Sequence, residues 1–261
     1  MASTKAGTAA DSMWWLAQGE GAVAAGLDWL SPREQARLAS FRYTKRRIEF
    51  LARRWAAKHA VAEWLQREDT PGLLAGIDIL NHASGAPYVL VDGRELALEI
   101  SISDRAGWAV CALGTPDGDG GALGIDLELV EPRSAGFVDD FFTAREAAWV
   151  RQLPAGDAHD EAANLIWSAK EAALKVLKIG LRADTREVEV SLSPTQRSDG
   201  WAALSVSGPG GAVFPGWWRR DGMFLVTLAG QRALPPPARL SRGGNLATAA
   251  PLHSWLAQPR V

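Results

Sequence analysis

Hydrophobic residues in the first half of the chain recur at two different spacings. Between residues 43 and 66, apolar residues three, four and seven positions apart fall on one face of a helix: Ile48, Leu51, Trp55 and Ala62. A shorter helix is predicted over residues 27–40, where Ser31 and Pro32 are typical of a helix start. From residue 77 the pattern changes to short β-like runs separated by Gly, Asn and Asp.

The runs predict strands at residues 77–80, 88–91, 96–102 and 108–113, after a first strand at 13–17. A glycine-rich breaker at 115–121 marks either a boundary between two halves or a hairpin loop. Beyond it the mixed pattern returns, with strands at 122–130, 188–192, 201–206 and 223–228 and helices at 137–151 and 161–178. We therefore expect an α+β protein of two similar lobes, 13–116 and 121–230, with flexible or loosely attached tails at 1–12 and 231–261.

Charge and composition narrow the function classes. The chain has 28 Lys and Arg against 30 Asp and Glu, a net charge of −2, which argues against a protein that coats nucleic acid. No apolar run approaches the roughly 20 residues of a membrane helix, and the N-terminus lacks the apolar core of a signal peptide. Cys111 is the single cysteine, which excludes a disulfide framework. We expect a soluble, cytoplasmic protein that binds neither nucleic acid nor membrane.

Two carboxylates occupy alternate positions of the predicted strand at 122–130. Because alternate side chains of a strand share a face, Asp126 and Glu128 project together, while Ile125, Leu127 and Leu129 face a core. Oxygen ligands paired in this way favour a hard cation such as Mg²⁺. The alternative is an amphipathic strand whose acidic face is solvated.

A third carboxylate lies on the predicted helix at 161–178. Glu171, Lys175 and Lys178 are spaced i, i+4 and i+7, so they share one helix face. A carboxylate beside lysines suits a metal that also holds phosphate, since Mg²⁺ is usually bound by a few carboxylates together with substrate phosphates. The alternative is an ordinary ion pair on the surface.

Basic residues crowd the helix predicted over 43–66. Arg47, Arg54 and Lys58 line up on one of its faces. Guanidinium groups fit phosphate oxygens, so a polyphosphate ligand is one use for this concentration of charge. A solvated helix face is the other interpretation.

These elements, in this order, resemble the 4′-phosphopantetheinyl transferase superfamily. The closer resemblance is to its larger two-lobed members, which modify carrier proteins of polyketide, nonribosomal peptide and fatty acid synthesis. G-I-D-L-E at 124–128 matches the family's G-[IV]-D-x-E, and W-S-A-K-E-A-A-L-K at 167–175 matches [FW]-[ST]-x-K-E-[AS]-x-x-K. F-F-T-A-R-E at 141–146 resembles the segment between them, and the basic helix at 45–54 resembles the one that meets coenzyme A phosphates.

The resemblance implies a monomer whose two lobes form a pseudo-dimer, each with a small antiparallel sheet packed on a long helix. Coenzyme A would lie between the lobes, its phosphates on the N-terminal side and the catalytic carboxylates on the C-terminal side. The implied reaction is the Mg²⁺-dependent transfer of 4′-phosphopantetheine to a serine of an apo acyl or peptidyl carrier protein, with release of adenosine 3′,5′-bisphosphate.

Residue roles follow from the same resemblance. It implies Asp126, Glu128 and Glu171 as the metal ligands, and Glu171 or else Glu146 as the base that takes the serine proton. Lys175 would contact phosphate oxygens during catalysis. The implied set of coenzyme A contacts is Arg47, Arg54, Ser103, Asp126, Lys170 and Lys175.

Three positions depart from the family pattern. Asp104 stands where the family carries a histidine at the coenzyme A phosphates, and Arg105 is the cation expected to neutralise it. Residues 84–87 read S-G-A-P where relatives often read G-K-P, so Ala86 replaces a lysine. Lys178 stands where a glycine is common, at the end of the predicted helix.

Two other functions fit the same residues. Clusters of Asp, Glu and Lys also serve metal-dependent nucleases and phosphohydrolases, although the narrow basic region suits one nucleotide better than a duplex. A catalytically weakened homologue that only binds coenzyme A or a carrier protein is the other, and Asp104 motivates it. We expect a carrier protein to dock on residues 137–153, and we expect His59, His82 and His159 to be structural.

Overall fold

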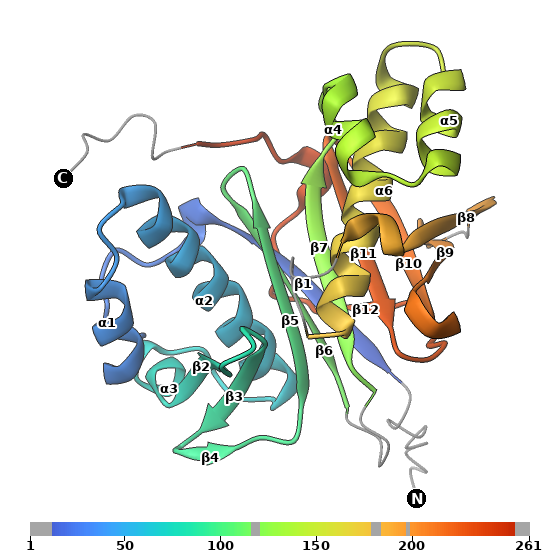
Figure 1. Ribbon diagram of the computed structural model, residues 1–261. Helices are drawn as coiled ribbons and strands as arrows, with labels where there is room; N and C mark the ends of the chain where they lie inside the picture. Colours follow the sequence, from blue (N-terminus) through green and yellow to red (C-terminus); the bar gives the residue numbers. More distant parts are fainter. Residues whose placement is uncertain (1–11, 116–120, 179–183, 197–198, 254–261) are drawn as a thin grey trace, which may run out of the picture.

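The computed structural model describes residues 12–115, 121–178, 184–196 and 199–253, which form two lobes in contact with each other (Figure 1). The elements of the N-terminal lobe are β1 (Met13–Gly19), α1 (Pro32–Ala39), α2 (Thr44–Trp64), α3 (Pro71–Ala75), β2 (Ile77–Asn81), β3 (Pro87–Val91), β4 (Arg94–Glu95), β5 (Glu99–Arg105) and β6 (Trp108–Gly114). Strands β1, β6 and β5 form an antiparallel sheet in that order, and α2 packs against it. Strands β2, β3 and β4 form a small second sheet.

Helix α1 begins later than the predicted residue 27. Ser31 and Glu34 form a capping box, in which each side chain accepts a hydrogen bond from the other residue's backbone N–H, at 3.3 and 3.0 Å. Pro32 follows at the first helical position and disfavours a helical conformation at the residue before it. Residues 27–31 therefore lie outside the helix.

The C-terminal lobe packs a second antiparallel sheet on a second long helix. Its elements are β7 (Leu123–Leu129), α4 (Ala135–Phe141), α5 (Ala144–Gln152), α6 (Asp157–Val176), β8 (Glu189–Gln196), β9 (Ala202–Ser207), β10 (Val213–Asp221) and β11 (Phe224–Gly230). The strand order is β7-β11-β10-β9-β8, and α6 contacts β7 and β11 most extensively.

Two sequence predictions for this lobe were wrong. The helix predicted over 137–151 is two helices, because Thr143 adopts an extended conformation and caps α5, with Glu146 completing a capping box. Strand β10 was not predicted: Pro215, Gly216 and adjacent arginines interrupt the apolar alternation that would have identified it.

The segment after residue 231, predicted as a loose tail, is ordered as far as residue 253. Strand β12 (Ala238–Arg239) pairs with β1 in parallel, and the side chains of Leu240 and Leu246 are buried. Glu63 of α2 accepts hydrogen bonds from the backbone N–H groups of Ser241 and Arg242 at 2.6 and 2.9 Å. The predicted tail at 1–12 and the breaker at 115–121 lie mostly outside the described residues.

The two lobes meet where β5 and β6 contact β7. One hydrophobic core spans this junction and includes Trp15 and Val110 from the N-terminal lobe with Ile125 and Phe224 from the C-terminal lobe. The predicted α+β class, with a small antiparallel sheet on a long helix in each lobe, is confirmed. No helix in the described part of the chain is long and apolar enough to cross a membrane.

Candidate active site

Strand β7 is buried along its whole length. Ile125 joins the core as predicted, but Asp126 and Glu128 are also buried, only 5% and 8% exposed, so the solvated acidic face is excluded. Gly124 explains how α6 packs so closely against this strand. A Cβ atom at Gly124 would lie 2.0 Å from the carbonyl oxygen of Ala172, so the approach requires glycine.

Side chains from both lobes converge on Asp126. Ser103 on β5 donates a hydrogen bond to Oδ1 and Ser168 on α6 donates one to Oδ2, each at 2.8 Å. The Lys175 ammonium, also on α6, lies 2.8 Å from Oδ1. Thr227 Oγ1 on β11 is 2.8 Å from the Ser168 hydroxyl. Three of the predicted coenzyme A contacts, Ser103, Asp126 and Lys175, are thus brought together at the junction of the lobes.

Glu128 is held by two arginines and a tryptophan. Arg133 donates to its Oε2 at 2.9 Å, Arg105 Nε lies 3.2 Å from the same oxygen, and Trp167 Nε1 donates to Oε1 at 3.1 Å. Burial and the neighbouring charge of Asp126 nevertheless raise the pKa of Glu128 to about 7. Burial, together with the charge of Asp126, therefore outweighs the stabilisation that the two guanidinium groups provide.

Glu171, on α6, completes the group that we call the carboxylate cluster: Asp126, Glu128 and Glu171. Its Oε1 atom is buried and has no hydrogen-bond partner among the described residues. Desolvation, followed by the charge of Asp126, raises the pKa of Glu171 to about 7, and Lys175 opposes this shift. A buried, unpartnered carboxylate oxygen is rare in folded proteins and is typical of a functional position.

The carboxylate cluster has the donor type and the excess negative charge that a Mg²⁺ ion requires. The unpartnered Glu171 oxygen and the raised pKa values of Glu128 and Glu171 are the signs of this excess. Among the described residues, however, no three His, Cys, Asp or Glu side chains converge as a ready metal site. These residue types are suitable ligands for Mg²⁺, but their side chains must reorient to bind the ion.

A pocket of about 200 Å³ lies next to the cluster, between the lobes. The loop at residues 84–87 and Ser101 on β5 form its N-terminal wall, and Lys175 and Lys178 form its C-terminal wall. Lys175 connects the pocket to the cluster, since the same ammonium contacts Asp126. The pocket is thus lined by cations directly beside the buried carboxylates.

Comparison with known proteins bears on the lobe that carries this cluster. Residues 122–200 match the family model of the 4′-phosphopantetheinyl transferase superfamily. The C-terminal lobe is thus similar to this superfamily over the matched residues. The match includes both signature segments, with Asp126, Glu128 and Glu171 inside it. The match indicates phosphopantetheinyl transfer as the general class of activity.

Comparisons of whole chains add less. None of the curated proteins matches the chain. Among solved structures, a holo-(acyl-carrier-protein) synthase from Bacillus anthracis str. Ames, in complex with CoA (3′,5′-ADP), is similar at 20% sequence identity and a TM-score of 0.33. The match covers 39% of this chain and 92% of that one. A likeness of this size carries no information about substrate or partner.

Two of the three basic residues that were predicted to share one face of α2 lie in the interior. Arg54 is 7% exposed and donates to Asn81 Oδ1 at 2.9 Å, and burial lowers its pKa to about 10. Lys58 is fully buried and lies 2.6 Å from the Glu34 carboxylate. Lys58 also donates to two backbone carbonyl oxygens, those of Trp29 and Leu74. Arg54 and Lys58 therefore stabilise the N-terminal lobe and do not present a face to phosphate.

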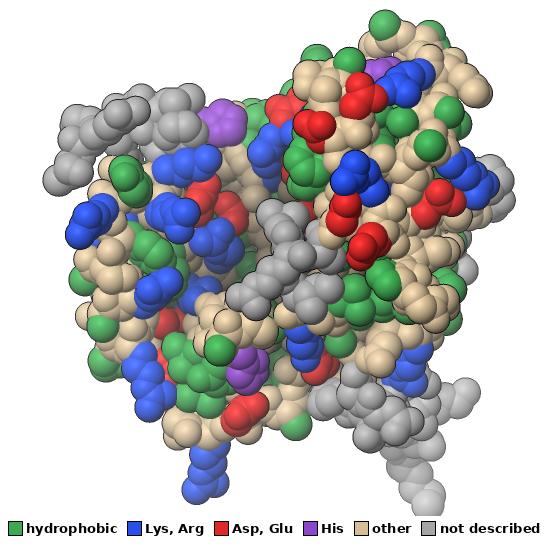
Figure 2. All heavy atoms as spheres, viewed as in Figure 1, with side chains coloured by type: hydrophobic (Ala, Val, Ile, Leu, Met, Phe, Trp, Pro, Cys, Tyr) green, Lys and Arg blue, Asp and Glu red, His purple; other side chains and the backbone are tan. Residues whose placement is uncertain are grey.

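The exposed cations lie nearer the start of α2. Figure 2 shows Lys and Arg side chains gathered over α1 and α2, and Arg42, Lys45 and Arg46 are exposed there. Arg47 is half-buried and donates one hydrogen bond to the Leu38 carbonyl oxygen at 2.9 Å. Of the two arginines that the superfamily pattern implicated, Arg47 is the one that remains accessible.

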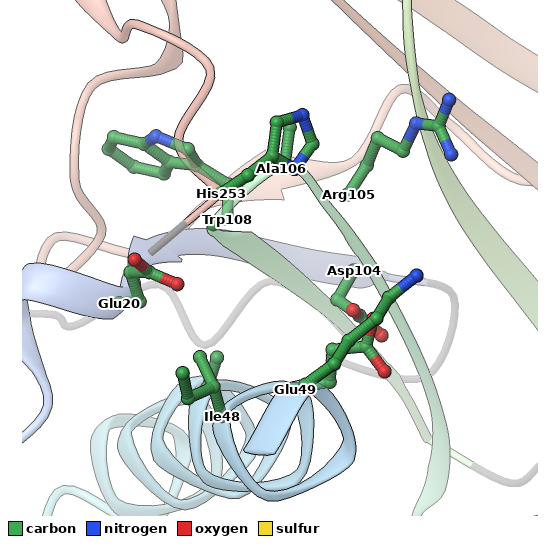
Figure 3. A pocket seen from close by; sticks show the side chains of 11 residues that line it. Glu20, Ile48, Glu49, Asp104, Arg105, Ala106, Trp108 and His253 are labelled. Atoms are coloured by element: carbon green, nitrogen blue, oxygen red, sulfur yellow. The ribbon is translucent and has the colours of Figure 1, made fainter. Parts of the chain in front are cut away.

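Asp104, at the position of the superfamily's histidine, is neutralised by Arg53 of α2 and not by the predicted Arg105. Arg105 instead pairs with Glu128 and Glu131. Figure 3 shows Asp104 and Glu49 facing one another in a pocket of about 100 Å³, with Arg105 directed away from them. Burial, followed by the charge of Asp104, raises the pKa of Glu49. Adjacent residues of a strand point to opposite faces, which explains why Arg105 cannot serve Asp104.

Glu146 and Lys170, predicted as a second base and a coenzyme A contact, form a buried ion pair at 2.7 Å. Glu146 also accepts hydrogen bonds from the backbone N–H groups of Thr143 and Val190, each at 2.8 Å. Lys170 is fully buried, and its ammonium donates to three backbone carbonyl oxygens, those of Phe141, Thr185 and Val188. The structure gives both residues a role in packing α5 and β8 on α6, so they are not carried into the site.

Three residues of the site were missed by sequence reasoning. Ser168 and Trp167 stand inside the motif at 167–175 and contact Asp126 and Glu128, so their motif position was an available signal. Arg133 follows the acidic strand by a few residues, and only the fold shows that its side chain bridges Glu128 and Asn164.

Proposed function

We propose that the chain transfers the 4′-phosphopantetheine arm of coenzyme A to a serine hydroxyl of an apo acyl or peptidyl carrier protein. The reaction depends on Mg²⁺ and releases adenosine 3′,5′-bisphosphate. The observation that carries the proposal is the carboxylate cluster, buried at the junction of the lobes beside a pocket lined with lysines. The superfamily match over residues 122–200 supports it.

Asp126, Glu128 and Glu171 are the residues that would hold Mg²⁺. When bound, the ion neutralises the pyrophosphate of coenzyme A and stabilises the charge that develops on the departing bisphosphate. Ser103, Ser168 and Lys175 position Asp126, and Arg105, Arg133 and Trp167 position Glu128. Two of the three carboxylates are thus held by neighbouring donors at the junction of the lobes, and Mg²⁺ binding would require them to reorient.

Lys175 and Glu171 act on the reacting groups. The Lys175 ammonium uses two of its three N–H groups on Asp126 and on the Ile125 carbonyl oxygen, and the third is directed to phosphate oxygens in the pocket. Glu171 takes the proton of the incoming serine at its unpartnered Oε1, directly or through water. Arg47 contacts the nucleotide phosphates from the N-terminal lobe.

The carrier protein docks beside α5, within the segment 137–153 that the sequence indicated. A groove of about 640 Å³ runs between α5, α6 and β8, and its apolar lining includes Trp149, Leu153, Leu165 and Trp218. Trp149 is exposed, and the Arg145 side chain at the edge of the groove is 80% exposed. An apolar surface with an exposed arginine at its edge is complementary to an acidic carrier helix.

The test is the intact mass of a purified apo carrier protein after incubation with this protein, coenzyme A and Mg²⁺. We expect the mass to increase by that of one phosphopantetheine group. Asp126→Asn and Glu171→Gln should each reduce the rate at least a hundredfold, on the order of 3 kcal/mol of transition-state stabilisation. The matched control is Asp92→Asn, since Asp92 is an exposed residue of the N-terminal lobe that pairs with Arg67 and lies outside the proposed site.

Other outcomes point to the other activity classes. Coenzyme A binding without any transfer, across several carrier proteins, would identify a homologue that only docks its ligands. Hydrolysis of coenzyme A or of a phosphodiester without transfer would identify a phosphohydrolase. Absence of coenzyme A binding would overturn the proposal for this site.

A further inference from the structure

The pocket between the lobes has an uneven distribution of charge. Its C-terminal wall contributes two ammonium groups, those of Lys175 and Lys178. Its N-terminal wall, formed by residues 84–87 and part of β5, contributes hydroxyl and apolar side chains and no cation. Within the described residues that line the pocket, an anion would therefore be held from the α6 side.

Lys178 adopts a backbone conformation that lysine rarely takes. It follows the C-cap residue Leu177 and has a φ of 56°, in the left-handed region where glycine is the usual residue at a helix end. Its backbone N–H donates to the Lys175 carbonyl oxygen at 3.0 Å, which closes the helix. A non-glycine residue in this conformation is strained, and such strain is characteristic of functional sites.

The Lys178 side chain lines the pocket and is paired with an acidic residue of β5. Its ammonium lies 3.1 Å from the Glu99 carboxylate on β5, and the side chain is 45% exposed. Glu99 thus orients the ammonium while the exposed side remains accessible to a ligand. Deeper in the pocket, Ser101 accepts a hydrogen bond from the Ile125 N–H at 3.0 Å, which leaves its own hydroxyl proton as a donor.

Two departures from the superfamily pattern meet in this pocket. Ala86 occupies a position where relatives often carry lysine, and Lys178 occupies one where they often carry glycine. The two residues are 92 positions apart in the sequence, yet both line the same cavity. A cation missing from one wall is matched by an additional cation on the other.

We propose that Lys178 binds a phosphate group of the ligand in this pocket and replaces the lysine that is absent at position 86. The inference rests on the proposed function in taking that ligand to be coenzyme A. Lys178 and Lys175 then hold adjacent phosphate oxygens, with the Ser101 hydroxyl as a further donor. Lys178 is a binding residue for the substrate and takes no part in proton transfer.

The test compares Lys178→Gly with its rescue. Calorimetric titration with coenzyme A and Mg²⁺ should show about tenfold weaker binding for Lys178→Gly, the loss expected for one charged hydrogen bond. Its melting temperature should be unchanged or higher, because glycine accepts the left-handed conformation without strain. Adding Ala86→Lys to this variant should restore most of the affinity. Arg94→Ala removes an exposed cation outside the pocket and should leave binding unchanged.

The outcomes separate this inference from the proposed function. If the wild-type protein binds coenzyme A and Lys178→Gly binds it equally well, the role of Lys178 is overturned while the proposed function stands. If Lys178→Gly binds coenzyme A tenfold more weakly and adding Ala86→Lys does not restore the affinity, the proposed exchange of a lysine between the two walls of the pocket is overturned. If the wild-type protein fails to bind coenzyme A, titration with inorganic pyrophosphate tests Lys178 alone: weaker binding by Lys178→Gly supports its role, and equal binding overturns it.

Discussion

Each lobe buries a group of ionised side chains beside its long helix, and the two groups differ in how their charges are matched. In the N-terminal lobe, Glu34 lies 2.6 Å from the Lys58 ammonium and 3.7 Å from Arg54 Nε. Its oxygens also accept hydrogen bonds from the backbone N–H groups of Ser31 and Ile79. One carboxylate thus has two cations and two backbone donors.

The carboxylate cluster of the C-terminal lobe has the opposite balance. Among the described residues, the cations in ion pairs with the cluster are Lys175, Arg105 and Arg133, and they pair with Asp126 or Glu128. Glu171 is left with a buried oxygen that has no partner among the described residues, and its pKa rises to about 7. Similar residue types therefore serve the fold in one lobe and remain partly uncompensated in the other.

The comparison separates structural from functional buried charge by how completely the carboxylate oxygens are satisfied. Arg54 Nε lacks a hydrogen-bond partner among the described residues, but both oxygens of Glu34 have one. A fully matched group stabilises the folded state through its partners, and removal of one member exposes the others to desolvation. A group with surplus charge destabilises the folded state until a ligand supplies the missing counter-charge. Substitutions in the two lobes should consequently shift stability in opposite directions.

The largest effect is expected for Lys58→Met. This change leaves the Glu34 carboxylate buried without its closest cation, and breaking a buried ion pair in this way costs about 3–5 kcal/mol of unfolding free energy. Urea unfolding followed by tryptophan fluorescence measures the loss. The control is Lys45→Met on the same helix, whose side chain is 52% exposed and should change the unfolding free energy by less than about 0.5 kcal/mol. Equal losses in the two variants would contradict a matched, structural role for the buried group.

A smaller effect of opposite sign is expected for Glu171→Gln without divalent ions. The folded-state pKa of about 7 lies above the ordinary value of 4.5, so the folded state binds more protons between those pH values. Wild-type stability should therefore fall as pH rises from 4.5 to 7. The Glu171→Gln variant lacks this loss and should be about 1–3 kcal/mol more stable at pH 8, since one pKa unit corresponds to about 1.4 kcal/mol.

This second prediction is checked by urea unfolding at pH 5 and pH 8 in the presence of a chelator. Glu95→Gln, at an exposed position on β4, is the matched control and should show the pH dependence of the wild type. A Glu171→Gln variant that is less stable than the wild type at pH 8 would show that Glu171 is a structural residue. That result would remove the reason for placing it in the carboxylate cluster.

The contrast also marks where sequence reasoning succeeds. The alternation in G-I-D-L-E fixes which side chains of β7 share a face, and both Asp126 and Glu128 contact side chains of α6 as a result. The periodicity of 157–176 likewise places Lys175 one turn beyond Glu171. Such local relations depend only on strand and helix geometry, so a sequence is sufficient to predict them.

Sequence reasoning fails where the partner of a charge lies far along the chain. Spacing puts Arg54 and Lys58 on one face of α2, but only the fold places Glu34 against that face. Asp104 similarly pairs with Arg53, 51 residues away, although the adjacent Arg105 is nearer in sequence. A charged helix face is therefore consistent with a phosphate site or with a buried ion pair until its neighbours are known.

The smallest effect is expected for His59, a titratable residue of the N-terminal lobe. Its Nδ1–H donates to the Trp55 carbonyl oxygen at 2.8 Å, and its other ring nitrogen lies 3.7 Å from Asp69. Burial lowers the pKa of His59 below its ordinary 6.5; Asp69 opposes this shift and Arg242 adds to it. The unfolded chain therefore binds the proton more readily, and stability attributable to His59 is lost as pH falls below about 6.5.

Comparison of wild type with His59→Gln at pH 7.5 and pH 5.5 isolates this contribution. The wild-type protein should lose more stability on acidification than the variant, by on the order of a few tenths of a kcal/mol, because glutamine does not titrate. The Glu171 contribution has the opposite sign, because protonation of Glu171 stabilises the folded state as the pH falls from 7.5 to 5.5. The double variant His59→Gln/Glu171→Gln should therefore have a flatter pH profile than His59→Gln alone. If acidification destabilises His59→Gln and the wild type equally, the pKa of His59 is the same in the folded and the unfolded chain. The pH dependence of stability then belongs to the carboxylate cluster alone.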